Sequence, residues 1–323
     1  MIKIDLITGF LGSGKTTFIK EYVRYLLGKG EKICILENDY GAINVDMMLL
    51  GDLRSENCDV EMLVCGGDAD CHKRRYKTKL ISMGMLGYTR VIIEPSGIYD
   101  VDEFFDTLYE EPLDRWYEIG NVITIVDSGL EDDLSKESDY ILASQAACAG
   151  TILLSRVDLL RKKDNSDVSE DYRSKVVNHL NKALSDIHCN RKIDDIVMEG
   201  PWEELKEADF EKIRNSGYVH ASYEKLPIDR EDGYKSLFYM KMHLTKADIL
   251  DRVRRIFADK TTGNVIRIKG FMEISENKWI EINATEKELN VTESDKGQDV
   301  IIVIGEKMNK EVISSYFPEG VSV

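Results

Sequence analysis

Short apolar runs alternate with longer amphipathic stretches along the first two-thirds of the chain. The apolar runs are rich in β-branched residues, and some, such as 122–126, are apolar on both faces of a strand. Runs of that kind are typical of a parallel sheet that helices cover on both sides. The alternation therefore predicts a doubly wound, mostly parallel α/β domain. The predicted strands are 2–8, 32–36, 60–64, 90–94, 121–126 and 151–155, and the predicted helices include 15–28, 72–86, 101–110, 134–148 and 171–187.

The pattern changes beyond the polar stretch 222–236, which contains Pro and Gly and which we interpret as a linker. After it, short strand candidates follow one another closely, with a helix near each end of the series. This order predicts a small α+β domain with a mostly antiparallel sheet, and we expect domains at 1–221 and 237–323. The predicted strands here are 237–244, 263–271, 278–283, 287–293 and 299–304, and the predicted helices are 246–258 and 308–316.

Composition narrows the classes of function. A length of 323 residues suits two domains. The net charge of −16 argues against broad nucleic-acid binding, although one nucleotide can still be held by a local site. The sequence has no apolar run long enough to span a membrane, and its first apolar run is too short for a signal peptide. We therefore expect a cytoplasmic protein, with no membrane partner, whose six cysteines are reduced.

The strongest motif is the segment 9–16, GFLGSGKT, which fits the phosphate-loop pattern G-x-x-x-x-G-K-[ST]. It follows a predicted strand and opens a predicted helix, as a P-loop NTPase requires. Its glycines let backbone N–H groups turn towards a phosphate, and the start of the helix adds partial positive charge. We expect Lys15 to reach the β- and γ-phosphates and Thr16 to ligate Mg²⁺; the alternative is a chance glycine-rich turn. The predicted phosphate-binding residues are Gly9, Gly12, Ser13, Gly14, Lys15, Thr16 and Thr17.

A later apolar strand ends in Glu94-Pro95-Ser96-Gly97. An acid at the carboxyl end of a parallel strand lies at the edge of the sheet where nucleotides bind. Glu94 is therefore a candidate to act on Mg²⁺ or on the attacking water, and Gly97 is a candidate to offer its backbone N–H to the γ-phosphate. The alternative is a strand-end acid that caps the next helix.

Another predicted strand ends in Ser155-Arg156-Val157-Asp158. Guanine-binding loops of P-loop GTPases typically read Asn/Ser-Lys-x-Asp after a late strand. A carboxylate there accepts from both the ring N–H and the exocyclic amine of guanine, and adenine offers no such pair of donors. We predict that Asp158 sets the base preference and that Arg156, in place of the usual Lys, stacks on the base. The alternative is an acid that caps the following turn.

Together these motifs resemble the CobW-like branch of the CobW/HypB/UreG family of P-loop GTPases. The resemblance implies GTP hydrolysis coupled to metal delivery or to the assembly of a metalloenzyme or cofactor, with GTP/GDP and Mg²⁺ bound and with a client protein as partner. A homodimer is also compatible with it. Asp39 and Asp46, in the first-switch segment, join Glu94 as candidates for Mg²⁺ or for the attacking water. The matching segments are 7–17 (ITGFLGSGKTT), 37–46 (ENDYGAINVD), 94–97 (EPSG), 126–127 (VD) and 265–271 (VIRIKGF).

The chain departs from this family at the metal motif. Many members carry Gly-Cys-x-Cys-Cys after the first switch, whereas residues 65–72 here read CGGDADCH. Asp68 and Asp70 stand where two cysteines are expected, and Cys71 remains. Such a set, with Cys65 or His72 as a further ligand, suits Zn²⁺ or another divalent transition metal such as Co²⁺, Ni²⁺ or Fe²⁺. The alternative is that the acids cap the next helix and the cysteines simply pack.

Three functions remain open at this point. The first is a metallochaperone-like GTPase in which GTP tightens metal binding at the loop 65–72 and hydrolysis releases the metal. The second is a GTP-gated assembly or activation factor without a metal site, whose domain 237–323 binds a client. The third is a small-molecule P-loop kinase, which leaves residues 155–158 unexplained.

Overall fold

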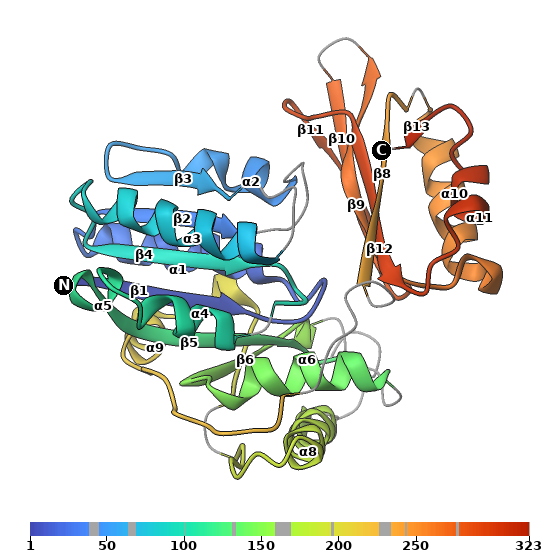
Figure 1. Ribbon diagram of the computed structural model, residues 1–323. Coiled ribbons are helices and arrows are strands. Elements are labelled where there is room, and N and C mark those ends of the chain that lie inside the picture. Colours follow the sequence, from blue (N-terminus) through green and yellow to red (C-terminus); the bar gives the residue numbers. More distant parts are fainter. Residues whose placement is uncertain are drawn as a thin grey trace. The chain divides into compact units, whose positions relative to one another are not determined.

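The computed structural model has two compact units, Met1–Leu226 and Pro227–Val323 (Figure 1). The division between them falls inside the stretch 222–236. Each unit has its own sheet and its own core, and each is described by itself below. The residues that the structure describes are 1–38, 45–63, 69–99, 101–130, 134–158, 169–194, 197–225, 234–242, 244–275 and 278–322.

The first unit is built on a seven-stranded sheet in the order β3-β2-β4-β1-β5-β6-β7. All six neighbouring pairs are parallel. Every residue of β2, β4 and β6 is buried, as expected for strands covered on both faces. The predicted doubly wound P-loop architecture is confirmed. The strands are β1 (Ile2–Thr8), β2 (Ile33–Asn38), β3 (Cys58–Met62), β4 (Arg90–Pro95), β5 (Tyr117–Asp127), β6 (Thr151–Ser155) and β7 (Val197–Glu199).

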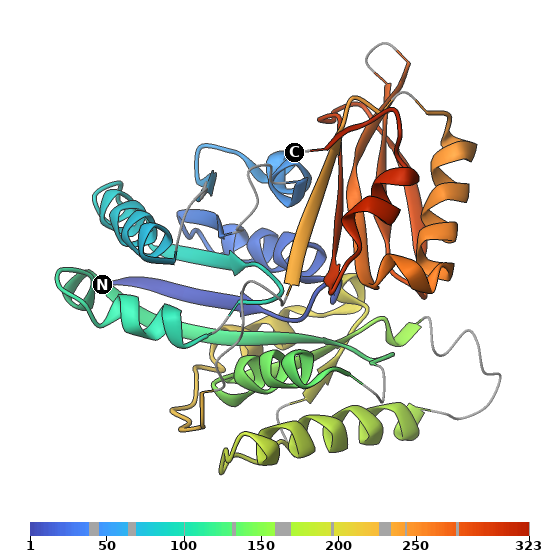
Figure 2. The same ribbon diagram turned by 45° about the vertical axis from the view of Figure 1, so that its right-hand side comes forward.

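Helices lie on both faces of this sheet (Figure 2). On one face α1 packs against α9 and η2, and their side chains form a core with the strands. On the other face α3 packs against α4 and α5, and α6 packs against α8. The helices are α1 (Lys15–Gly28), α2 (Val45–Leu50), η1 (Gly51–Leu53), α3 (Ala69–Gly84), α4 (Asp102–Leu108), α5 (Leu113–Trp116), α6 (Lys136–Ala147), α8 (Ser169–Asp186), η2 (Trp202–Glu204) and α9 (Glu207–Arg214).

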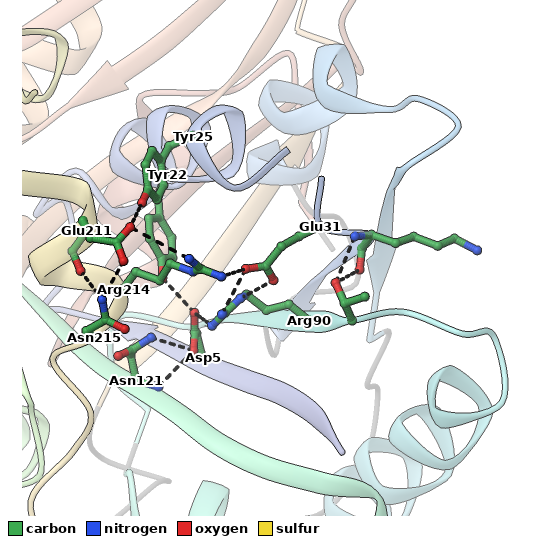
Figure 3. Close-up of polar contacts among 11 residues, drawn as sticks. Asp5, Tyr22, Tyr25, Glu31, Arg90, Asn121, Glu211, Arg214 and Asn215 are labelled. Carbon is green, nitrogen blue, oxygen red and sulfur yellow. Dashed lines mark hydrogen bonds and ion pairs between the residues drawn. The ribbon is translucent and has the colours of Figure 1, made fainter. Parts of the chain in front are cut away.

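A buried charge network ties these layers together (Figure 3). The Asp5 carboxylate of β1 accepts hydrogen bonds from the Arg90 guanidinium (2.7 Å) and the Tyr22 hydroxyl (3.0 Å). Arg90, which begins β4, also donates to Glu31 (2.7 Å), and Glu31 in turn accepts from Arg214 of α9 (2.9 Å). Asp5 and Arg90 are almost fully buried, so their charges are compensated by one another and by these partners.

The second unit is a six-stranded antiparallel sheet in the order β11-β10-β9-β12-β8-β13. Its helices α10 and α11 lie on the same face of the sheet (Figure 1). Ile249, Val253 and Ile256 of α10 share a core with Ile268 and Ile301 of the sheet. The predicted α+β class is confirmed. The elements are β8 (Tyr234–Met240), α10 (Lys246–Ala258), η3 (Lys260–Thr262), β9 (Asn264–Ser275), β10 (Lys278–Ala284), β11 (Leu289–Ser294), β12 (Val300–Glu306), α11 (Lys310–Ser315) and β13 (Val321–Ser322).

Among the described helices, none has the length and apolar character needed to cross a membrane.

Candidate functional site

The phosphate loop connects β1 to α1, and its shape depends on glycine. Gly12 and Gly14 have φ values of 77° and 91°, in the left-handed region that other residues rarely adopt. A Cβ on Gly9 would lie 2.3 Å from the Ile125 carbonyl oxygen, so only glycine fits against β5 there. Gly14 is the N-cap of α1, and the first turn of that helix has no acidic residue. The helix start is therefore suited to an anion.

Lys15 and Thr16 begin α1 at the carboxyl edge of the sheet, where Thr16 contacts Glu94. The Lys15 amine is buried and donates a hydrogen bond to the Gly9 carbonyl oxygen (2.9 Å), so the side chain folds back across the loop. The Thr16 hydroxyl donates to the Glu94 carboxylate (2.9 Å). Thr16 and Glu94 are 78 positions apart in the sequence, and the fold brings their side chains into direct contact.

The donor set at this edge fits a divalent cation. Glu37, at the end of β2, is the register partner of Glu94 on β4, and both side chains are about 97% buried. Two buried carboxylates on adjacent strands repel each other unless a positive charge offsets them. Oxygen ligands of this kind, together with the Thr16 hydroxyl, are those that Mg²⁺ prefers. Glu37 had no predicted role, although a charged residue near the end of a buried apolar strand was a usable signal.

Two hydroxyl groups on the loop also fit a bound anion. Thr8 Oγ1 and Ser13 Oγ are buried, and neither has a hydrogen-bond partner among the described residues. A buried hydroxyl without a partner is costly. A phosphate oxygen is an acceptor that these hydroxyls can satisfy, so the loop is chemically matched to a phosphate group.

Gln145 of α6 holds the backbone that follows β4. Its side-chain amide donates to the carbonyl oxygens of Gly97 (3.1 Å) and Tyr99 (3.5 Å). Gly97 itself lies against the phosphate loop, because a Cβ there would come within 2.7 Å of the Leu11 nitrogen. The side chain of Gln145 is fully buried. It is a site residue that the sequence analysis missed, since a polar residue within a helix carries no pattern of its own.

Ser155 ends β6 and Arg156 and Asp158 follow it, at the same carboxyl edge as the phosphate loop. Arg156 has a positive φ of 58°, which turns the chain after the strand. Its guanidinium forms an ion pair with Asp127, the last residue of β5 and the register partner of Ser155. Asp158 is partly buried. The structure therefore places the three predicted base-binding residues two strands away from β1.

Trp202 of η2 lies beside the start of α1. Its ring packs edge-on against Phe18, with the centroids 5.3 Å apart. Its indole nitrogen lies 4.0 Å from the position that a Cβ on Gly14 would take. This contact was also missed, because Trp202 is 188 positions from Gly14 in the sequence.

The predicted metal loop falls largely outside the described residues. That applies to Cys65 and Asp68, to Asp39 of the first switch, and to the side chains of Asp46 and Asp70. Within the part of the chain that the structure describes, no three His, Cys, Asp or Glu side chains are grouped to hold a metal ion. Burial raises the pKa of Cys34 to about 12 and that of Cys148 to about 11, so these thiols stay protonated at neutral pH. Cys71 is partly exposed.

Both ring nitrogens of His72 contact protein groups. The residue is 1% exposed in the first turn of α3. Its Nδ1 lies 2.8 Å from a carboxylate oxygen of Glu103, and its Nε2 lies 2.7 Å from the side-chain oxygen of Asn38. Both ring nitrogens are thus engaged by protein groups. A metal ligand needs one ring nitrogen available, so a metal at His72 would have to displace Glu103 or Asn38. The role of His72 as a further metal ligand stays a prediction.

Comparison with known proteins identifies the family. A model described as the CobW/HypB/UreG nucleotide-binding domain matches residues 3–184. The chain belongs to the CobW/HypB/UreG family. A second model, the cobalamin synthesis protein cobW C-terminal domain, matches residues 243–319 of this CobW/HypB/UreG protein. The resemblance inferred from the motifs is confirmed by both matches.

Curated relatives of this CobW/HypB/UreG protein include the zinc chaperone YjiA of Escherichia coli (strain K12), which is 30% identical over 167 residues. That match covers 49% of this chain and 50% of YjiA, so the chain spans about half the length of this relative. The zinc-regulated GTPase metalloprotein activator 1 of Dictyostelium discoideum is 26% identical over 319 residues, which cover 85% of this chain and 63% of that protein.

Among solved structures, Zn(II)-bound YjiA GTPase from E. coli aligns over 98% of both chains, with 16% identity and a TM-score of 0.40. The family assignment rests on the two sequence models.

Proposed function

We propose that this protein hydrolyses GTP and that its nucleotide state controls delivery of a divalent metal ion to a client metalloprotein or cofactor-assembly protein. The observation that carries the proposal is the contact between the Thr16 hydroxyl and the Glu94 carboxylate, beside the buried Lys15 amine. Family membership supports the same function, as do relatives named as a zinc chaperone and a zinc-regulated GTPase metalloprotein activator.

Phosphate binding falls to the loop 9–17 in this proposal. The Lys15 amine exchanges its hydrogen bond to Gly9 for the β- and γ-phosphates, and the backbone N–H groups at the start of α1 hold the same oxygens. The buried Ser13 hydroxyl gains an acceptor. Mg²⁺, when bound, neutralises charge on the phosphates, and Thr16, Glu94 and Glu37 are the described residues that would hold it. Asp46 stays a further candidate.

Hydrolysis then requires a water placed opposite the bond that breaks. The water oxygen bonds to the γ-phosphorus, the bond from that phosphorus to the bridging oxygen of GDP breaks, and phosphate leaves. Because Thr16 engages Glu94, we assign Glu94 to the Mg²⁺ side, which leaves Asp39 as the candidate for orienting the water. Gly97 offers its N–H to the γ-phosphate, and Gln145 holds the carbonyl group of the same residue.

Base recognition falls to the turn after β6. Asp158 accepts from the ring N–H and the exocyclic amine of guanine, and Ser155 and Arg156 complete the turn. The ion pair between Arg156 and Asp127 fixes the direction of the Arg156 side chain beside the proposed base site. The alternative of a small-molecule P-loop kinase assigns no role to residues 155–158.

The metal is cargo in this proposal, and zinc is the first candidate because relatives are named for it. Cys65, Asp68, Asp70 and Cys71 are the proposed ligands, and His72 stays a further candidate. Thiolates favour Zn²⁺, whereas carboxylates also accept harder ions. We expect GTP to tighten metal binding and hydrolysis to weaken it, and this coupling must be reciprocal.

The guanine assignment is tested by nucleotide preference. We expect the wild-type protein with Mg²⁺ to turn over GTP in preference to ATP and XTP. Asp158→Asn should lower kcat/KM for GTP by roughly 10²-fold or more and raise it for XTP, because the amide pairs with the xanthine carbonyl. Asp186→Asn, an exposed acid on α8, is the matched control. Equal turnover of ATP and GTP by the wild-type protein would contradict the assignment.

The metal assignment is tested by anaerobic Zn²⁺ competition with a chromophoric chelator, once with GDP and once with a non-hydrolysable GTP analogue. Cys71→Ser should weaken binding, whereas Cys148→Ser should not, because that thiol is buried. Absence of Zn²⁺ binding in both nucleotide states would favour the GTP-gated assembly factor without a metal site.

A further inference from the structure

His72 lies where three elements of the first unit meet. From the first turn of α3 it reaches Glu103, in the first turn of α4, and Asn38, the last residue of β2. The Nδ1–H donates to the Glu103 carboxylate. The contact between Nε2 and Asn38 holds for either orientation of the amide, because its oxygen accepts from an N–H and its NH₂ donates to a bare nitrogen.

Both partners of His72 are linked to the segment that follows β4, at the edge of the sheet where we propose that nucleotide binds. The backbone oxygen of Asn38 accepts a hydrogen bond from the Ser96 N–H (2.9 Å), and Ser96 stands between Glu94 and Gly97. Asn38 is also the register partner of Pro95. Glu103 is the second residue of α4, the helix that follows the same segment. The imidazole is therefore connected from two directions to the chain between β4 and α4.

On its other side, His72 is joined directly to the proposed metal ligands. It follows Cys71 in the sequence and lies in the same helical turn. The ring is buried, and one of its contacts is to a carboxylate, so displacing it costs a charge-assisted hydrogen bond. A shift of the first turn of α3 is thus transmitted to Asn38 and Glu103.

We propose that His72 is a positioning residue that couples the first turn of α3, with its candidate metal ligands, to the nucleotide-binding segment between Glu94 and Gly97. This inference rests on the proposed function. It gives His72 a part in regulation that its contacts with Glu103 and Asn38 support. The coupling acts through Asn38 on one side and through Glu103 on the other.

The test measures amide hydrogen exchange of α3 with Mg²⁺ and either GDP or a non-hydrolysable GTP analogue. In the wild-type protein, exchange in the first turn should differ between the two states by at least about fivefold, the lower end of ordinary coupling factors. His72→Leu should abolish that difference while α1 keeps its protection by nucleotide. His72→Gln, which retains one hydrogen-bonding group, should keep part of it.

His179 provides a matched control. Its Nε2 pairs with Asp139 (2.7 Å) between α8 and α6, also within the first unit and largely buried. His179→Leu removes a contact of the same type, and the α3 response should stay at the wild-type level. If His72→Leu does not fold, Glu103→Ala removes the contact between Glu103 and His72 instead. The Glu103 side chain is 17% exposed, so this change is less disruptive to the core.

A second readout separates this inference from the proposed function. The ratio of Zn²⁺ dissociation constants in the GDP and GTP-analogue states should be about 5–150 in the wild-type protein and close to one in His72→Leu. Missing hydrolysis or missing Zn²⁺ binding in the wild-type protein overturns the proposed function. A nucleotide response of α3 that survives in both His72→Leu and Glu103→Ala, or is absent from the wild-type protein, overturns the coupling role.

Discussion

Gln145 extends its carboxamide from α6 to the two carbonyl oxygens that follow β4. The side chain is fully buried, and its contact fixes the direction of the Gly97 peptide against the phosphate loop. In the proposed mechanism the N–H of Gly97, in the preceding peptide, meets the γ-phosphate as the bond to GDP breaks. Gln145 is therefore a positioning residue that acts through Gly97, and its contribution belongs to the step of hydrolysis more than to nucleotide binding.

We predict that Gln145→Ala lowers kcat for GTP by about 10-fold to 100-fold and leaves KM within a few-fold, because interactions made mainly in the transition state affect kcat. Steady-state phosphate release measures both constants. Gln298→Ala, an exposed residue of the second unit, is the control. A rise in KM with unchanged kcat would place Gln145 in ground-state binding instead.

At the scale of elements, the network around Arg90 fixes β1, β4 and α9 to one another. The Arg90 guanidinium contacts Asp5 (2.7 Å) and Glu31 (2.7 Å), and Arg214 brings α9 onto Glu31 (2.9 Å). Removing one partner of a buried ion pair leaves an uncompensated charge, which is more costly than removing the pair. The network thus makes the packing of α9 dependent on a residue of a central strand.

We predict that Arg90→Met lowers the free energy of unfolding by about 3–5 kcal/mol, because Asp5 and Glu31 lose their main cationic partner. The double variant with Asp5→Asn should lose less than the sum of the two single variants. Urea unfolding gives both values. Arg115→Met, at an exposed ion pair with Glu111, should change stability by less than about 1 kcal/mol. Strict additivity of the two buried substitutions would refute the network.

The elements also show what the sequence determines locally. The boundaries of β1, α1, β6 and α10 match their predictions, because apolar runs and helix-start signals were sufficient there. The short elements β7, α2, α5 and α9 were not predicted, since three to eight residues are too few for a clear period. Their positions depend on tertiary packing. The helix α9, for example, is held by the ion pair between Arg214 and Glu31.

The candidate site likewise has one part that the sequence predicts and other parts that depend on tertiary contacts. The phosphate loop could be predicted because its chemistry is contained in eight consecutive residues. The contacts of His72 with Asn38 and of Gln145 with Gly97 join positions 34 and 48 residues apart. Neither contact leaves a periodic or compositional mark. The metal-ligand prediction for His72 rests on its adjacency to Cys71, which says nothing about the direction of the side chain, and it stays a prediction.

At the scale of the whole molecule, the proposed nucleotide contacts all lie in the first unit. Each unit has its own hydrophobic core, one around α1 and the parallel sheet and the other around α10 and the antiparallel sheet. A ligand that binds only a folded state stabilises the part that forms its site. The units are therefore expected to respond differently to nucleotide.

We predict two transitions in differential scanning calorimetry, of which GTP analogue with Mg²⁺ raises only the one that belongs to the first unit. At about 1,000 times the dissociation constant, the stabilisation is about 4 kcal/mol. Lys15→Ala, which removes the phosphate-binding amine, should lose the shift. A single transition, or equal shifts of both, would show that the two cores unfold as one cooperative unit.

The position of Trp202 has an optical consequence. Its indole lies against Phe18 and next to Gly14, so its fluorescence senses the immediate surroundings of the phosphate loop without any attached dye. The chain has only two other tryptophans, Trp116 over Gly84 at the end of α3 and Trp279 in the second unit. When those two are replaced by phenylalanine, Trp202 is the only tryptophan left. The rate of nucleotide binding can then be measured by stopped-flow fluorescence of this one native residue.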